Sequence, residues 1–170
     1  MVIQERSKPG EFLKLFKKED SVTIAHYLDP HLVLFLDVAT RDEAIAQLID
    51  QLDRAGQLKD KEAFHHAILE REKIVSTGIG LGVAIPHAKC AGYHDFFLAV
   101  GIQKRQGIEW EALDGTLVHI VFLIGGPEDK QTDYLKILSR LTLAIKDEER
   151  RKKLLKAMTV QNVIDLFSDC

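Results

Sequence analysis

The chain has 170 residues, of which 46% are hydrophobic and 29% charged, the balance expected of one folded domain. Its formal net charge is −3, with acidic and basic residues interspersed, so we do not expect the basic surface of a nucleic-acid-binding protein. The longest apolar run, residues 117–126, is far shorter than the roughly 20 residues that cross a bilayer. Residues 1–12 lack the apolar segment of a signal peptide. We therefore expect a cytoplasmic protein that is not embedded in a membrane.

The first half of the chain predicts one strand and two long helices. Residues 1–20 carry the pattern of a short amphipathic helix, and we treat them as an extension of a domain that spans residues 21–170. Residues 32–38 are aliphatic and aromatic, as in a buried strand. Thr40 and Glu43 form a capping-box pattern, which predicts a helix from there to Gly56. A second helix is expected from about residue 60 to residue 73.

The second half predicts two more strands and three helices. The strands are expected at residues 95–102 and 117–124, with Asp114 and Gly115 marking a turn before the second. Helices are expected at residues 129–145, 147–158 and 160–167, and Tyr134, Leu138 and Leu141 share one face of the first. Helices mixed with strands that are apolar on both faces indicate an α/β domain, in which helices cover both sides of a central sheet.

The stretch STGIGLGVAIPHAKC, residues 76–90, combines three glycines with one proline before a histidine. The glycines lack the G-x-G-x-x-G spacing of a dinucleotide-binding turn, and no Gly-Lys-Ser/Thr sequence follows as in a phosphate-binding P-loop. Glycine lets main-chain N–H groups approach an anion, whereas Pro86 fixes its own φ and favours an extended Ile85. The backbone therefore limits where the imidazole of His87 can point.

Donors suited to a phosphoryl group precede this histidine. Arg71 ends the predicted helix, and Ser76 and Thr77 lead into the glycines. A guanidinium can hold two phosphoryl oxygens, and a neutral imidazole, with a reference pKa of about 6.5, is a nucleophile toward phosphorus at neutral pH. On residue type alone, a single histidine in such a loop is more often structural. The pattern suits a phosphohistidine, but the structural alternative stays open.

The stretch REKIVSTGIGLGVAIPHAK, residues 71–89, resembles the IIA component of the fructose- and mannitol-type branch of the bacterial phosphoenolpyruvate-dependent phosphotransferase system, especially its free-standing nitrogen-regulatory type. Weaker similarity runs from about residue 32 to residue 167. The resemblance implies the mannitol-type IIA fold, a single domain with a mixed β-sheet, and no cofactor. It implies that His87 accepts a phosphoryl group from the phosphocarrier protein HPr and that Arg71 steadies it. Ser76 and Thr77 would hydrogen-bond the phosphoryl group or shape the loop.

One position departs from the family. Members often place a second histidine after the Pro-Glu pair, facing the active one, and the matching residue here is Tyr134. A tyrosine hydroxyl can donate a hydrogen bond but carries no positive charge at neutral pH.

The resemblance implies a regulated protein target or a IIB component as the next acceptor of the phosphoryl group. Because the chain carries no permease or IIB segment, we expect a regulatory output, with a sugar-specific IIA component as an alternative.

Two alternatives to the phosphoryl-carrier function remain open from the sequence. A domain of the same fold could bind partners without phosphorylation, which Tyr134 motivates. A hydrolase or thiol enzyme could use Cys90 with His87, which only their closeness in sequence motivates. No metal site is predicted, because the other histidines show no paired ligand motif for zinc. His119 alternates with apolar residues along a strand, so we expect a core histidine and keep it as an outside candidate for a catalytic partner.

Overall fold

The computed structural model describes residues 23–170, so the helix expected within residues 1–20 lies outside the described residues. The helices of this part are α2 (Ile24–Tyr27), the 3-10 turn η1 (Pro30–Leu32), α3 (Arg41–Arg54), α4 (Lys61–Ile74), α5 (Gln131–Lys146), α6 (Glu148–Lys156) and α7 (Val160–Asp165). The strands are β1 (Val33–Leu36), β2 (Gly78–Gly80), β3 (Val83–Ala84), β4 (His87–Cys90), β5 (Phe97–Gln103) and β6 (Ile120–Pro127).

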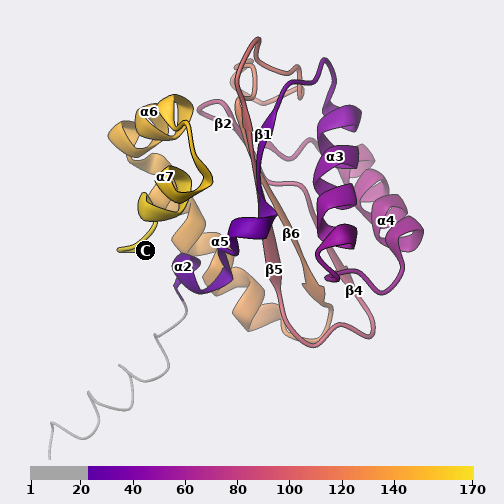
Figure 1. Cartoon of the computed structure of the whole chain (residues 1–170). Helices are drawn as coiled ribbons and strands as arrows, with labels where there is room; N and C mark the ends of the chain where they lie inside the picture. The colour runs from indigo at the N-terminus through magenta and orange to yellow at the C-terminus, as the bar shows by residue number, and fades with distance from the viewer. Residues whose placement is uncertain (1–22) are drawn as a thin grey trace, which may run out of the picture.

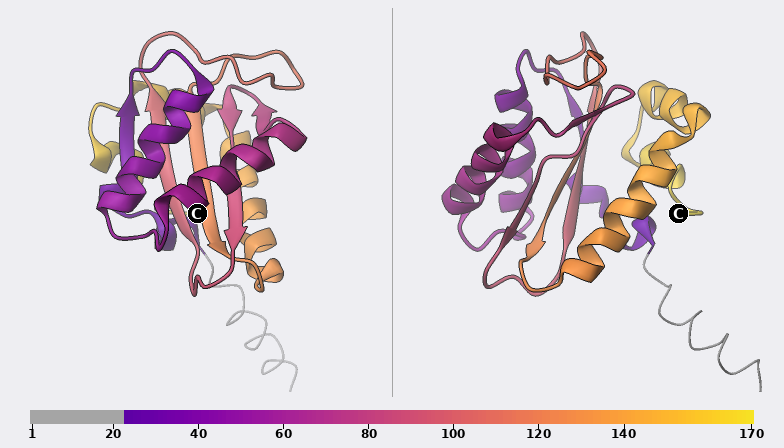
Figure 2. Two further views of the ribbon diagram at one scale, coloured as in Figure 1. Left: turned by 90° about the vertical axis from the view of Figure 1, so that its right-hand side faces the viewer. Right: turned by 180° about the vertical axis from the view of Figure 1, so that it is seen from behind.

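These elements form three layers around one sheet. Helices α3 and α4 cover one face, and α5 with α2, α6 and α7 covers the other (Figure 1). Figure 2 shows the same arrangement from the side of α3 and α4 and from behind. The expected α/β architecture, a mixed sheet flanked on both faces by helices, is therefore confirmed.

The sheet is mixed, because its central two strands pair antiparallel with each other and the strands on either side pair with them in parallel. Strands β5 and β6 pair antiparallel, and β1 adds to β5 in parallel. Strands β3 and β4 both pair with β6 in parallel, one after the other along its free edge, and β2 pairs antiparallel with β3. This register places His87 opposite Ile124 of β6. The histidine therefore begins a strand that is held along the edge of the sheet.

Each face of the sheet has its own hydrophobic core, because side chains alternate along the buried strands. On β5, Leu98 and Val100 belong to the core under α5, whereas Phe97 and Ala99 belong to the core under α3 and α4. Every residue of β5 and β6 is buried. The two-sided burial explains why these strands have continuous apolar sequences, and it gives the site a rigid support.

Most of the predicted elements are present, with shifted ends. The Thr40 hydroxyl accepts a hydrogen bond from the backbone N–H of Glu43 at 3.2 Å, and Gly56 follows the helix with a φ of 76°, so the predicted start and end of α3 are confirmed.

The main difference between the predicted and the observed elements lies in residues 76–90. The glycines and the proline of this stretch predict a loop, but the structure folds it into the short strands β2, β3 and β4. Pairing of β3 and β4 with β6, and of β2 with β3, makes these residues strands, rather than local propensity.

Candidate phosphohistidine site

A tight turn brings the glycine-rich stretch back onto the sheet. Leu81 and Gly82, between β2 and β3, both have positive φ angles, of 60° and 75°, as a two-residue hairpin turn requires. The Asp114 carboxylate accepts a hydrogen bond from the N–H of Leu81 at 3.0 Å. The Thr116 hydroxyl accepts one from the N–H of Gly82 at 3.2 Å. The predicted turn at residues 114–115 thus holds the hairpin that leads to His87.

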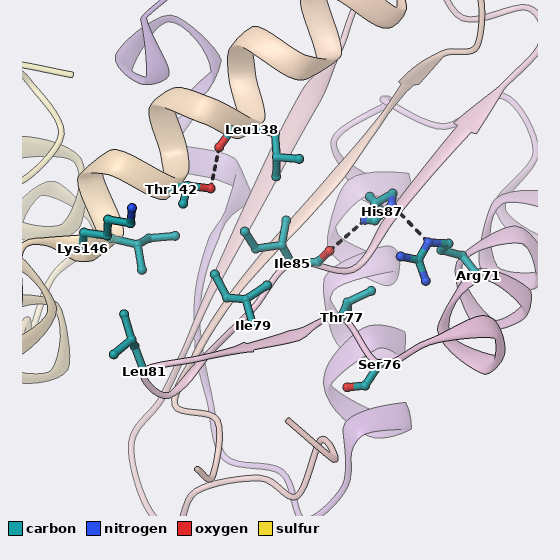
Figure 3. A pocket seen from close by; sticks show the side chains of 11 residues that line it. Arg71, Ser76, Thr77, Ile79, Leu81, Ile85, His87, Leu138, Thr142 and Lys146 are labelled. Carbon is teal, nitrogen blue, oxygen red and sulfur yellow. Dashed lines mark hydrogen bonds between the residues drawn. The ribbon is translucent and has the colours of Figure 1, made fainter. Parts of the chain in front are cut away.

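The two ring nitrogens of His87 have different partners (Figure 3). Nδ1 lies 2.9 Å from the carbonyl oxygen of Ile85, which can only accept, so Nδ1 carries the ring proton. Nε2 lies 3.2 Å from Nε of Arg71, which can only donate, so Nε2 keeps its lone pair. The stiff segment before the histidine supplies the carbonyl group that selects this tautomer. The lone pair at Nε2 is the nucleophilic position of the ring.

The surroundings of His87 favour its neutral form. Burial lowers the pKa of the imidazole, and the positive charges of Arg71 and Lys89 lower it further. The hydrogen bond to the Ile85 carbonyl and the negative charge of Glu72 act in the opposite direction. Because the pKa of His87 is lowered overall, the imidazole is unprotonated and nucleophilic at neutral pH.

Arg71 reaches the histidine from the last turn of α4. Its Nη1 donates to the carbonyl oxygen of Val75 at 2.9 Å, while its Nε faces the imidazole. The guanidinium is therefore anchored on the backbone just after its own helix. Its planar group of donors lies beside the atom where a phosphoryl group would attach.

A buried carboxylate fixes the segment between α4 and the hairpin. Glu72 is 4% exposed, and its Oε1 accepts hydrogen bonds from the backbone N–H of Thr77 and from Nε1 of Trp110, each at 2.9 Å. Its Oε2 accepts the Thr77 hydroxyl at 2.6 Å. The roles of Glu72 and Trp110 are not predicted from the sequence. A signal was present, because Glu72 continues the buried Phe64 and Ile68 at intervals of four along one face of α4.

Ser76 and Thr77 lie in this segment, and their hydroxyls have partners within the protein. Thr77 is buried, and its hydroxyl contacts both Glu72 and the indole nitrogen of Trp110. The Ser76 hydroxyl donates to the carbonyl oxygen of Trp110 and accepts from the N–H of Gly78. The geometry therefore ties both side chains to the course of the backbone near His87.

Tyr134 lies directly beside the histidine. Its ring centroid is 5.6 Å from that of His87, and the Tyr134 side chain is 5% exposed. Burial raises the pKa of the Tyr134 hydroxyl, so the residue is neutral at physiological pH. The structure thus brings together Arg71, His87 and Tyr134, which come from α4, β4 and α5.

A cavity of about 350 Å³ extends from this site along α5. His87 and Arg71 lie at one end of it and Lys146 lies at the other (Figure 3). The wall between them is mainly apolar and includes Ile79, Leu81, Ile85, Leu138 and Ile145, with Thr142, whose hydroxyl donates to the Leu138 carbonyl oxygen. The nucleophilic histidine is therefore approached over an apolar surface with cations at both ends.

The other two candidate catalytic residues, Cys90 and His119, lie outside the site around His87. Cys90 packs with Ala88 against the core under α3 and α4, whereas His87 faces α5, because alternate residues of β4 point to opposite sides of the sheet. Burial also raises the pKa of the Cys90 thiol, which disfavours the thiolate. His119 lies beside the hairpin turn, where its N–H donates to the Gly82 carbonyl, and it does not line the cavity. Neither residue forms a catalytic pair with His87.

Two kinds of feature are absent from residues 23–170. No three His, Cys, Asp or Glu side chains in this part gather where they could hold a metal ion. No helix of the same residues is long and apolar enough to cross a bilayer.

Residues 26–170 match the family model of the phosphoenolpyruvate-dependent sugar phosphotransferase system, EIIA 2. The chain belongs to this family, and the resemblance carried by residues 71–89 is confirmed. The expected division into an extension of residues 1–20 and a domain of residues 21–170 stays a prediction.

Relatives of two kinds share this sequence pattern. The fructose-specific EIIABC component of Bacillus subtilis is 38% identical over 85% of this chain, which spans only 23% of that protein's length. The fructose-specific EIIA component of Haloferax volcanii is 36% identical over 77% of this chain and 84% of its own. The nitrogen regulatory protein of Bradyrhizobium diazoefficiens is 32% identical over 78% of this chain and 86% of its own.

Solved structures share the fold. The crystal structure of the nitrogen regulatory protein IIA-Ntr from Neisseria meningitidis has a TM-score of 0.79, with 25% identity over 85% of this chain and 99% of that one. The mannitol IIA enzyme of Escherichia coli, in its complex with the phosphorylated mannitol IIB enzyme, has a TM-score of 0.72 and 20% identity over 84% of this chain and 98% of that one. The expected mannitol-type IIA fold is confirmed.

Proposed function

We propose that the protein is a phosphoryl carrier of a phosphoenolpyruvate-dependent phosphotransferase system, and that Nε2 of His87 accepts the phosphoryl group from an HPr-type phosphocarrier. The observation that carries the proposal is the pair of contacts at His87. The Ile85 carbonyl keeps the proton on Nδ1, and Arg71 faces the lone pair of Nε2. This arrangement presents a neutral nucleophile next to a group that binds phosphoryl oxygens.

The transfer step is a single in-line displacement. The Nε2 lone pair of His87 forms a bond to phosphorus while the bond between phosphorus and the donor's histidine nitrogen breaks, and that electron pair returns to the donor ring. The proton stays on Nδ1, where the Ile85 carbonyl offsets the positive charge that develops on the ring. Arg71 turns from the lone pair to the phosphoryl oxygens. The step is reversible and needs no cofactor.

The other site residues have supporting roles in this proposal. Ser76 and Thr77 shape the segment after α4 through their bonds to Trp110 and Glu72, and so they fix the position from which Arg71 acts. Tyr134 forms the neutral wall of the site on the α5 side. The mechanism assigns no step to Cys90 or His119.

The onward acceptor distinguishes two candidate roles in the cytoplasm. We propose a regulatory output, in which the negative charge added at His87 changes the affinity for a target protein. The relative named a nitrogen regulatory protein supports this role. A sugar-specific role, with a IIB component as acceptor, is the second candidate, and the two fructose-specific relatives favour it.

The test is intact-protein mass spectrometry after incubation with phosphoenolpyruvate, enzyme I and HPr at neutral to alkaline pH, where phosphohistidine persists. We expect one added phosphoryl mass on the wild type and on Cys90→Ser, and none on His87→Ala. The Cys90→Ser variant is the matched control, because it alters the neighbouring nucleophile on the same strand. An unmodified wild type, with the donor proteins active on another IIA domain, would support the binding module that works without phosphorylation.

A further inference from the structure

Lys89 shares one face of the sheet with His87. Successive side chains of a strand point to opposite faces, and Ala88 and Cys90 pack into the core under α3 and α4. His87 and Lys89 therefore both project toward α5, and both are half-buried. The lysine is two residues from the nucleophile on a strand whose register is fixed by β6.

Two residues of α5 hold the Lys89 ammonium. Its Nζ lies 4.6 Å from the ring centroid of Tyr134, the distance of a cation–π contact, and it donates to Oε1 of Gln131 in the first turn of α5. The same Tyr134 ring lies 5.6 Å from the His87 ring. One aromatic side chain thus contacts both the nucleophile and the ammonium, and it places the charge at the edge of the site.

A phosphoryl group on His87 presents three acceptor oxygens, and Arg71 approaches it from the side of α4 alone. Such a group carries a charge of about −1.5 to −2 at neutral pH. Arg71 provides one positive charge from the side of α4, and the neutral Tyr134 provides none from the side of α5. Lys89 already acts on the imidazole, because its charge contributes to the lowered pKa of His87. An ammonium has three N–H donors, and its bond to Gln131 uses one of them.

We propose that Lys89 is a second phosphoryl-binding residue, whose ammonium swings from Gln131 to an oxygen of the phosphoryl group on His87. The long, unbranched side chain permits this movement while the strand stays in place. No covalent bond of the lysine changes, and no proton is transferred. This inference rests on the proposed function and adds to it a residue for which neither the sequence pattern nor the comparisons gives a role.

The test compares the full-length wild type with three variants. Lys89→Gln removes the charge, and Lys89→Arg retains it. Lys130→Gln is the matched control, because that lysine lies next to Gln131 and its Nζ donates instead to the His94 carbonyl oxygen at 2.8 Å. Each protein is equilibrated with phosphorylated HPr, and the fraction phosphorylated is measured by mass spectrometry. Each phosphorylated protein is then titrated by ³¹P NMR, since a nearby cation lowers the pKa of the phosphoryl group.

For Lys89→Gln we expect the transfer equilibrium constant to fall about tenfold, the lower end of what a hydrogen bond to a charged group contributes, and the pKa of the phosphoryl group to rise, while Lys89→Arg and Lys130→Gln stay near the wild type. Unchanged values for Lys89→Gln would overturn the proposal. A slower transfer with an unchanged equilibrium and phosphoryl pKa would overturn it too, because Lys89 would then act only in docking the donor.

A separate arm distinguishes this inference from the proposed function. The proteins are also phosphorylated chemically with phosphoramidate, which needs no carrier protein. If HPr fails to phosphorylate the wild type but phosphoramidate succeeds, the proposed function fails and the ³¹P titration still tests Lys89. If neither donor phosphorylates His87, both proposals are wrong.

Discussion

Arg71 and His87 are joined by a direct contact, in which Nε of the guanidinium lies 3.2 Å from Nε2 of the imidazole. The contact crosses from the end of α4 to the start of β4, between residues 16 apart in the sequence. In the proposed function, the cation therefore lies at the attachment point before the phosphoryl group arrives, and the site is preorganised for charge at that atom.

Replacing Arg71 tests how much this contact contributes. Hydrogen bonds to charged groups are worth about 1.5–3 kcal/mol, so we expect Arg71→Gln to slow phosphoryl transfer from HPr by about 10- to 100-fold. Arg71→Lys keeps the charge but loses the planar pair of donors, and its transfer rate should lie between those of the wild type and Arg71→Gln. Rapid-quench kinetics measures the rates. Arg54→Gln, at the end of α3, is the control, and a wild-type rate for Arg71→Gln would contradict the assigned role.

The protonation of His87 links function and stability to pH. Its pKa is lowered by burial and by Arg71 and Lys89, against the opposing effects of Glu72 and the Ile85 carbonyl. We expect the rate of phosphoryl acceptance to reach half its maximum below about pH 6.5, the reference value for histidine. The NMR titration of the His87 ring should give the same midpoint. A midpoint at or above the reference value would show that the imidazole is not held neutral.

The same shift predicts a loss of stability in mild acid. The pKa of His87 is higher in the unfolded chain than in the folded protein, so the unfolded chain binds the proton first as pH falls. The contribution of the neutral imidazole to the free energy of unfolding is therefore fully present above about pH 6.5 and is lost as pH falls below it. Urea unfolding of wild type and His87→Gln between about pH 8 and about pH 5 measures the contribution. The free energy of unfolding of the wild type minus that of His87→Gln should decrease as pH falls. A difference that stays constant would refute the linkage.

Glu72→Gln tests the buried carboxylate. The amide oxygen of glutamine can still accept from the N–H of Thr77 and the indole N–H of Trp110, but its NH2 group then faces the Thr77 hydroxyl, which loses its buried acceptor. We expect the free energy of unfolding to fall by about 1–3 kcal/mol, as measured in urea. Glu70→Gln changes an exposed carboxylate on the same helix and should leave the stability unchanged. Equal effects of the two substitutions would show that the buried bonds are unimportant.

Leu81→Asn separates stability from function. Leu81 has a φ of 60° and is 50% exposed, so leucine is strained there and buries little of its side chain. Asparagine tolerates this conformation, and we expect it to raise the free energy of unfolding by about 1 kcal/mol. Transfer from HPr should become slower, because Leu81 lines the cavity beside His87. Leu113→Asn, at a fully exposed position without a positive φ, is the control, and a destabilised Leu81→Asn would be the contrary result.

The sequence predicts the elements whose signals are local. Helix α3 begins at a capping threonine and ends near a glycine, and strands β5 and β6 have uninterrupted apolar runs. The short strands β2, β3 and β4 have no such signal. Strands β3 and β4 form because β6 offers a free edge for hydrogen bonding, and β2 then pairs with β3, so the assembled sheet decides this pairing.

The sequence by itself determined that a stiff, proline-preceded segment presents His87, because backbone restriction acts between neighbouring residues. Only the tertiary structure decided what surrounds the imidazole. Packing of α4 and α5 against β4 brings Arg71 and Tyr134 to it, and the bond of Glu72 to Trp110 joins residues 38 apart in the chain. Such contacts depend on how helices pack against a sheet, and no local pattern in the sequence encodes that distance.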